Sequence, residues 1–172
     1  DNGRIIERTT SLDASKHSIM DLFCGIGGFS HGFEKTGEFQ VASAVDLLGD
    51  RLDTFCANHS SATAYGRDIR ELTIKQIERD SPRPFVIVGG PPCQGFSSLR
   101  PFRNVEWNDP RNNLGEEFVR FVSSLRPDWI VFENVVGLLT HGKGTTFKSI
   151  TAAFEELGYR TSAKVINGAH FG

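Results

Sequence analysis

Short, continuous apolar runs that alternate with helix-like segments constrain the fold of this chain more than any other feature of its sequence. The runs of strand length lie at 18–23, 39–46, 62–68, 85–90 and 128–135, the third being the weakest. Segments with apolar residues at helical spacing lie at 28–37, 48–59, 73–80, 112–127 and 145–159. Apolar strands alternating with helices are typical of a parallel sheet covered on both faces. We therefore predict a doubly wound, mostly parallel α/β domain with strand order 3-2-1-4-5 and right-handed connections.

The two ends of the sequence differ from this pattern. Residues 1–17 are polar and are predicted to form an N-terminal tail, so the domain is expected to span residues 18–172. The stretch 161–172 is predicted to begin a sixth strand that the chain does not complete. We find neither the apolar stretch of a signal peptide nor a run of about 18 apolar residues that would predict a membrane helix.

Charge and cysteine content exclude some classes of protein. The formal net charge of −2 gives no electrostatic reason to expect nucleic-acid binding. An odd number of cysteines, Cys24, Cys56 and Cys93, argues against a disulfide framework, and their spacing predicts no metal site. Free thiols fit a reducing compartment, so we expect a cytoplasmic protein, or a nuclear one in a eukaryote. Cys24 is predicted to pack behind a turn and Cys56 on the core face of a helix.

A glycine turn follows the first predicted strand. Gly25, Gly27 and Gly28 would let the backbone approach a ligand closely, and Asp46 ends the second strand 21 residues after Gly25. An acidic residue at about this spacing can accept hydrogen bonds from ribose hydroxyls. The spacing is G-x-G-G rather than G-x-G-x-x-G, which favours a nucleoside ligand without a pyrophosphate. A tight turn that binds no ligand is the alternative.

Two reactive side chains follow the fourth and fifth predicted strands. Pro91 and Pro92 stiffen the chain before Cys93, which would hold its thiol out at the carboxyl edge of the sheet. Glu133 directly follows the apolar run WIVF, so we expect a buried carboxyl group with a raised pKa that can protonate a substrate nitrogen. The alternatives are a structural cysteine, and a glutamate that caps a turn or pairs with an arginine.

Together these motifs resemble the cytosine-5 DNA methyltransferases. The resemblance covers residues 18–172 and is carried by DLFCGIGGFS, GGPPCQGFS, ENV, DPRNNL and NGAHFG. It implies a Rossmann-like, S-adenosylmethionine-dependent methyltransferase domain that is incomplete at its C-terminus. It makes Cys93 the nucleophile that adds to carbon 6 of a flipped-out cytosine in DNA, and Glu133 the acid at ring N3. The methyl group would go to carbon 5, with S-adenosylhomocysteine as the other product.

The resemblance also assigns binding residues. The implied cofactor contacts are Phe23, Gly25, Ile26, Gly27, Gly28, Asp46, Leu47, Asp68, Ile69, Gly90, Pro92 and Leu114. Asp46 stands where many relatives carry glutamate, which shortens the reach to the ribose by one methylene. The implied contacts to double-stranded DNA are Gln94, Ser97, Arg100, Arg103 and Arg111.

The family pattern continues with a Gln-x-Arg-x-Arg segment, a target-recognition domain and a closing helix, none of which is in this sequence. We therefore expect a fragment of a restriction-modification methyltransferase, or a subunit completed by a C-terminal partner chain, that does not methylate duplex DNA alone. The alternatives are a methyltransferase acting on tRNA and a catalytically silent cofactor-binding subunit. A thiol hydrolase using Cys93 would need a histidine base, and no histidine is predicted at the carboxyl edge of the sheet.

Overall fold

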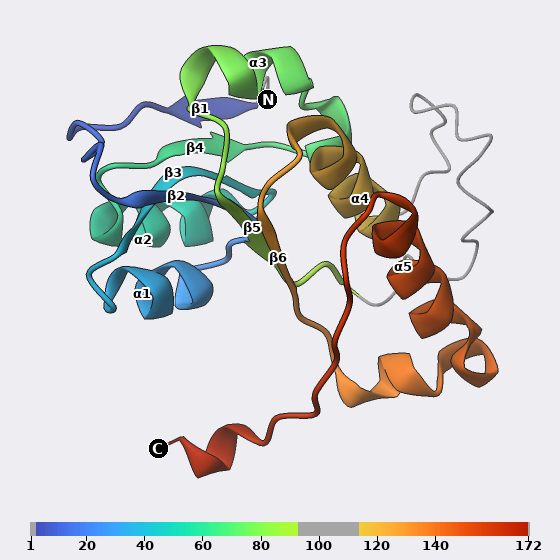
Figure 1. Cartoon of the computed structure of the whole chain (residues 1–172). Helices are drawn as coiled ribbons and strands as arrows, with labels where there is room; N and C mark the ends of the chain where they lie inside the picture. The colour runs from blue at the N-terminus through green and yellow to red at the C-terminus, as the bar shows by residue number, and fades with distance from the viewer. Residues whose placement is uncertain (1–2, 93–113, 172) are drawn as a thin grey trace.

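The computed structural model describes residues 3–92 and 114–171, which form a six-stranded sheet with helices on both faces (Figure 1). The strands are β1 (Arg4–Ile6), β2 (His17–Leu22), β3 (Phe39–Asp46), β4 (Thr63–Gly66), β5 (Val86–Gly89) and β6 (Trp129–Phe132). Their order is β1-β4-β3-β2-β5-β6, and every pair from β4 to β6 is parallel. The predicted order of the five parallel strands and the predicted fold class are therefore confirmed.

All five helical segments predicted from the sequence are helices. They are α1 (Gly28–Glu34), α2 (Gly49–Asn58), α3 (Ile74–Asp80), α4 (Leu114–Leu125) and α5 (Thr145–Glu156). Short 3₁₀ turns add η1 (Ile69–Glu71), η4 (Val136–Leu139), η5 (His141–Gly144) and η6 (Gly168–His170). Local signals set several boundaries: Thr73 and Gln76 form a capping box at the start of α3, and Gly158 takes φ +92° just beyond α5.

The helices form two layers because side chains alternate between the faces of each strand. Helices α1 and α2 cover one face, where Ile19 and Val88 pack with Leu52 and Phe55 (Figure 1). Helices α3, α4 and α5 cover the other face, where Met20 and Leu22 belong to a larger cluster with residues of all three helices. Cys24 is buried and Cys56 is half-buried against the first cluster, as predicted.

Three predictions about the strands are wrong. The N-terminal stretch assigned to a tail contains β1, which pairs antiparallel with β4 and extends the sheet. The predicted sixth strand is not formed: residues 160–171 are exposed and contain only the turn η6. The fifth predicted strand, β6, is not fully buried, since Trp129 is 64% exposed and its other three residues are half-buried. Within the described residues, β6 is the edge of the sheet, so its outer side has no strand to cover it.

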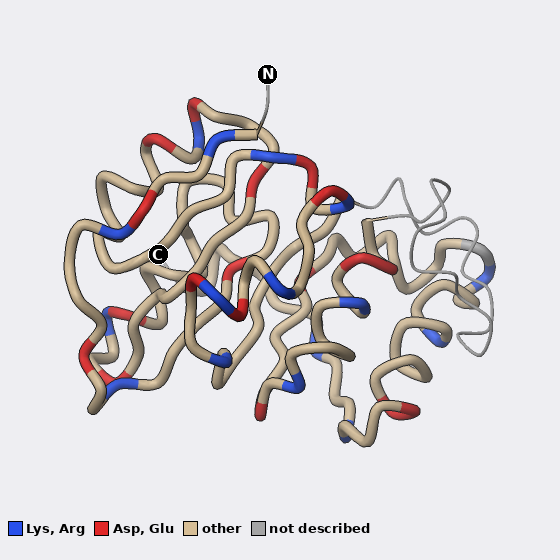
Figure 2. Tube along the Cα trace, turned by 90° about the horizontal axis from the view of Figure 1, so that it is seen from above, with Lys and Arg blue, Asp and Glu red and all other residues tan. Residues whose placement is uncertain are grey.

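Basic and acidic residues are interspersed along the described trace rather than gathered by sign (Figure 2). This distribution agrees with the nearly neutral net charge of the whole sequence. No helix in the described part of the chain is long and apolar enough to cross a membrane.

Candidate functional site

Apart from Leu114, which begins α4, the predicted site residues that the structure describes lie at or just after the ends of the parallel strands. Strands β2 and β5 are neighbours and reach the carboxyl edge together, with Leu22 paired to Gly89. The glycine turn continues from β2, and the Pro91–Pro92 segment continues from β5. In an open α/β sheet, ligands bind outside this edge, where the strand order reverses. The reversal here lies at β2, because β3 and β5 pair with its two sides.

The glycine turn between β2 and α1 is strongly curved. Phe23, Gly25 and Gly27 have φ values of 60°, 54° and 96°, a region that residues other than glycine rarely adopt. A Cβ atom placed on Gly25 or Gly28 would meet nothing within 4 Å. Among the described residues, nothing therefore covers the outer side of the turn at Gly25 and Gly28.

Asp46 at the end of β3 holds this turn directly. Its Oδ2 accepts a hydrogen bond from the backbone N–H of Gly25 at 2.8 Å, and its Oδ1 accepts one from the N–H of Leu48 at 2.9 Å. Each carboxylate oxygen can accept a second hydrogen bond, so the group remains able to bind a hydroxyl. The exposed side chains of Ile26 and Leu47, at 62% and 65%, add apolar surface beside it. A ligand with hydroxyl groups and an apolar planar part fits this combination.

The other proposed cofactor contacts are held by neighbouring side chains or by the core. Asp68 is bound to the guanidinium of Arg70, and this interaction lowers the pKa of its carboxyl group. Ile69 is only 3% exposed and belongs to the larger core cluster, against which Phe23 and Leu114 also pack. The backbone of this region is held by Arg120, which donates hydrogen bonds to the carbonyl oxygens of Ile69 and Leu72 at 2.9 and 3.1 Å.

Glu133 lies against the backbone of the segment that leads to Cys93. A Cβ atom placed on Gly90 would lie 2.7 Å from Oε2 of Glu133, so a side chain at position 90 would displace this carboxylate from its present position. The N–H of Glu133 donates to the Gly89 carbonyl oxygen at 3.0 Å, and the Asn134 side-chain amide donates to the Pro91 carbonyl oxygen at 2.8 Å. The segments after β5 and β6 are thereby joined at the sheet edge.

Burial of Glu133 was expected and is not found. The residue is exposed, because the edge strand β6 brings it to the border of the sheet rather than to its centre. Pro91 is buried and Pro92 is exposed, so the chain turns toward solvent where its described part ends. Cys93 and the proposed DNA contacts Gln94, Ser97, Arg100, Arg103 and Arg111 lie outside the described residues.

Sequence reasoning missed the buried polar residues behind the glycine turn. Asp21 is 1% exposed and accepts a hydrogen bond from the Ser30 hydroxyl at 2.6 Å. Burial is the main cause that raises the pKa of this carboxyl group to about 7. His59 is 3% exposed and lies beside Gly27. An aspartate inside the apolar run SIMDLF was the available signal for the first of these, whereas no local pattern marks His59.

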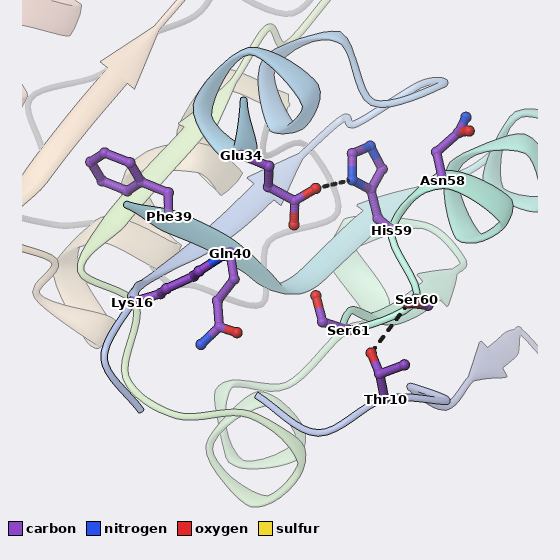
Figure 3. A pocket seen from close by; sticks show the side chains of 9 residues that line it. All are labelled: Thr10, Lys16, Glu34, Phe39, Gln40, Asn58, His59, Ser60 and Ser61. Carbon is purple, nitrogen blue, oxygen red and sulfur yellow. Dashed lines mark hydrogen bonds and ion pairs between the residues drawn. The ribbon is translucent and has the colours of Figure 1, made fainter. Parts of the chain in front are cut away.

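A cavity of about 340 Å³ lies away from these strand ends (Figure 3). It is near the start of β3, whereas Asp46 is at the end of that strand. Its lining is polar and consists of Thr10, Lys16, Glu34, Phe39, Gln40, Asn58, His59, Ser60 and Ser61. None of these residues was predicted as a site residue.

Comparison with known proteins matches nearly the whole chain. The model of the C-5 cytosine-specific DNA methylase family matches residues 17–172. The chain is 41% identical over 157 residues to Type II methyltransferase M1.HphI of Haemophilus parahaemolyticus, covering 90% of this chain and 42% of that protein. Type II methyltransferase M.FnuDI of Fusobacterium nucleatum is 34% identical over 154 residues, which again cover 90% of this chain and 42% of that protein.

Solved structures support the same fold. A mutant DNMT2 of Spodoptera frugiperda superposes with a TM-score of 0.63 at 26% identity, covering 83% of this chain and 41% of that one. The chain thus spans less than half the length of each of these three relatives.

Proposed function

Because this chain belongs to the C-5 cytosine-specific DNA methylase family, we propose that the protein carrying it methylates carbon 5 of cytosine in DNA. The observation that carries the proposal is the joining of two motif segments at one sheet edge. Glu133 packs on Gly90, three residues before Cys93, and Asn134 binds the carbonyl group of Pro91. The names of the relatives, which are type II methyltransferases, favour the same activity.

S-adenosylmethionine is the proposed cofactor and would supply the methyl group. The residues described around the glycine turn fit it. Asp46 keeps free acceptor positions for ribose hydroxyls, and the open side of Gly25 and Gly28 leaves room for the methionine part. Ile26 and Leu47 offer apolar surface to the adenine ring. Asp68, Gly90, Pro92 and Leu114 remain proposed contacts at the border of this region.

The proposed chemistry of the chain's own residues uses one thiol and one carboxyl group. Cys93 as a thiolate adds to ring carbon 6, and Glu133 protonates ring N3, which makes carbon 5 nucleophilic. Once carbon 5 is methylated, it loses its proton and the bond between carbon 6 and the Cys93 sulfur breaks. A base stacked in a duplex is out of reach of both groups, so the cytosine must be flipped out.

A covalent trapping experiment tests this function. Oligonucleotides containing 5-fluorocytosine cannot lose the substituent at carbon 5, so the enzyme should remain attached to them in the presence of S-adenosylmethionine. We expect the protein expressed from its complete reading frame to form the adduct with duplex DNA, and Cys93→Ser to abolish it. An adduct with RNA only would redirect the proposal to RNA methylation. An adduct that persists in Cys93→Ser, or none with any nucleic acid, would refute the assigned chemistry.

The 172-residue chain in the same experiment tests whether it is sufficient alone. We propose that it is not, because the relatives are more than twice its length and our sequence analysis finds no target-recognition segment. Its adduct yield should rise on addition of the remaining part of the protein. Methylation of a specific DNA site by the 172-residue chain at the rate of a complete enzyme would contradict this.

A further inference from the structure

The rear side of the glycine turn rests on the ring of a buried histidine. A Cβ atom placed on Gly27 would lie 2.5 Å from Nε2 and 2.9 Å from Cδ2 of His59. It would also lie 3.0 Å from the ring of Phe55, whose centroid is 4.5 Å from that of His59. Gly27 and His59 are both buried, so the ring and the turn are packed closely against each other.

The ring of His59 is held in place by Glu34, the last residue of α1. The Nδ1 atom of His59 lies 2.6 Å from Oε2 of Glu34 (Figure 3). The other carboxylate oxygen, Oε1, accepts a hydrogen bond from the backbone N–H of Val41 at 3.0 Å. Partial burial raises the pKa of Glu34, but the hydrogen bonds from His59 and Val41 outweigh it and hold the pKa below its usual value. An ionised carboxylate can only accept, so Nδ1 of His59 carries the proton.

These contacts connect three elements to the turn. Helix α1 starts at the turn, and Glu34 ties its far end to β3 and to the end of α2. His59 is the C-terminal cap of α2 and reaches back from there to Gly27. Asp46 holds the same turn from its other side, through the N–H of Gly25. The position of the turn is therefore set between a carboxylate at the sheet edge and a histidine behind it.

Glu34 and His59 are separate from the proposed cofactor contacts. Both line the cavity near the start of β3, to which the Glu34 side chain is open, being 26% exposed (Figure 3). The His59 side chain is 1% exposed, and its Nε2 makes no hydrogen bond among the described residues. Water from this cavity can solvate the space that is left when Glu34 is replaced by a smaller residue. Glu34 is therefore a suitable residue to substitute in a test.

We propose that Glu34 and His59 are positioning residues, which set the affinity of the glycine turn for the cofactor without touching it. The inference rests on the proposed function, because it takes the turn as the cofactor site. It assigns a role in cofactor binding to a hydrogen bond whose partners are 25 residues apart in sequence. Without Glu34, the ring of His59 loses the contact that fixes its rotation, and Gly27 loses a fixed surface.

The test compares variants of the protein expressed from its complete reading frame by calorimetric titration with S-adenosylmethionine. We expect Glu34→Ala to weaken binding roughly tenfold, corresponding to about 1.4 kcal/mol. Glu34→Gln, which keeps an acceptor for Val41, should lie between Glu34→Ala and the wild type. Glu38→Gln is the matched control, because it removes an exposed carboxylate four positions away and should bind like the wild type.

A second control separates positioning from stability. Leu125→Ala removes a buried side chain on the opposite face of the sheet, so it should destabilise the chain while leaving affinity for the cofactor nearly unchanged. A readout without ligand completes the test: the amide NMR signals of Gly25, Gly27 and Gly28 should shift in Glu34→Ala and not in Leu125→Ala.

The outcomes distinguish the inference from the function on which it rests. A wild-type chain that binds S-adenosylmethionine, with Glu34→Ala binding equally well and the glycine signals unmoved, would overturn the positioning role alone. A wild-type chain with no affinity for S-adenosylmethionine would count against the cofactor site itself, and the inference would fall with it. Weaker binding in Glu34→Ala and in Leu125→Ala alike would reduce the effect to lost stability and would also overturn the inference.

Discussion

Asp21 should make the stability of this chain depend on pH near neutrality. Asp21 lies in β2 and is 1% exposed, and among the described residues only one of its carboxylate oxygens has a hydrogen bond, which it accepts from the Ser30 hydroxyl. Burial is the largest cause of the raised pKa, about 7 in the folded chain against an ordinary value of 3.8. The hydrogen bond from Ser30 and the nearby His59 oppose this rise and do not cancel it.

The direction and size of the effect follow from proton linkage. Between pH 4 and pH 7 the folded chain holds a proton on Asp21 that the unfolded chain has lost, so the free energy of unfolding falls as pH rises. The full difference between the two pKa values corresponds to about 4 kcal/mol. Roughly 2.5 kcal/mol of it should develop between pH 5 and pH 8, because part is already lost below pH 5.

Replacement of Asp21 by asparagine isolates this contribution. Asp21→Asn keeps an acceptor for Ser30 and removes the ionisation. The buried N–H donors of the new amide group also change the free energy of unfolding, but by an amount that does not depend on pH. Urea unfolding followed by circular dichroism at pH 5, 6, 7 and 8 should show the variant gaining stability over the wild type as pH rises, by roughly 2.5 kcal/mol in total.

The control and the refuting result both concern how steeply the free energy of unfolding changes with pH. Asp13→Asn removes an exposed carboxyl group whose pKa is lowered, mainly by hydrogen bonding from the Ser15 side chain, so it should not change the slope between pH 5 and pH 8. If the curves of Asp21→Asn and the wild type stay parallel over this range, Asp21 is ionised in the folded chain and the reasoning from burial is refuted.

Three further predictions concern the site and its support. In the protein expressed from its complete reading frame, Gly90→Ala should displace the carboxylate of Glu133, so methyl transfer measured with tritiated cofactor should fall at least about tenfold while the unfolding midpoint stays near that of the wild type. Asp46→Ala removes the acceptor of two backbone N–H groups and should cost roughly 1–3 kcal/mol in urea unfolding; an unchanged midpoint would contradict the contacts described. Arg120→Ala leaves the buried carboxylate of Glu117 without this partner and removes the hydrogen bonds to the carbonyl oxygens of Ile69 and Leu72, so it should cost roughly 3–5 kcal/mol; replacing both Arg120 and Glu117 by methionine should recover only the part that comes from the unpaired carboxylate.

Much of the fold could be predicted because its signals are local. The apolar runs, the capping box at Thr73 and the glycine at position 158 each act within a few residues, and all predicted helices were found. The strand order followed from the general topology of parallel sheets. The sequence also marks the strand ends, which placed the glycine turn, Asp46 and Glu133 at one edge of the sheet. The direct contacts of Gly25 with Asp46 and of Gly90 with Glu133 are seen only in the structure.

The residues that lie behind the glycine turn could not be predicted in this way. Glu34 and His59 have no pattern in common, and their contact exists because α1 and α2 pack on the same face of the sheet. The exposure of Glu133 likewise depends on β6 being an edge strand among the described residues, which its apolar sequence does not reveal.

The sequence by itself determined the five parallel strands, the five helices and the residues at the carboxyl ends of those strands, because periodicity, caps and turn residues act over short distances. Only the tertiary structure decided which strand is an edge, which side chains are buried, and that Glu34 of α1 is hydrogen-bonded to His59 at the end of α2 behind the glycine turn. These properties depend on which surfaces face each other after the chain has folded, and burial then sets the pKa of groups such as Asp21.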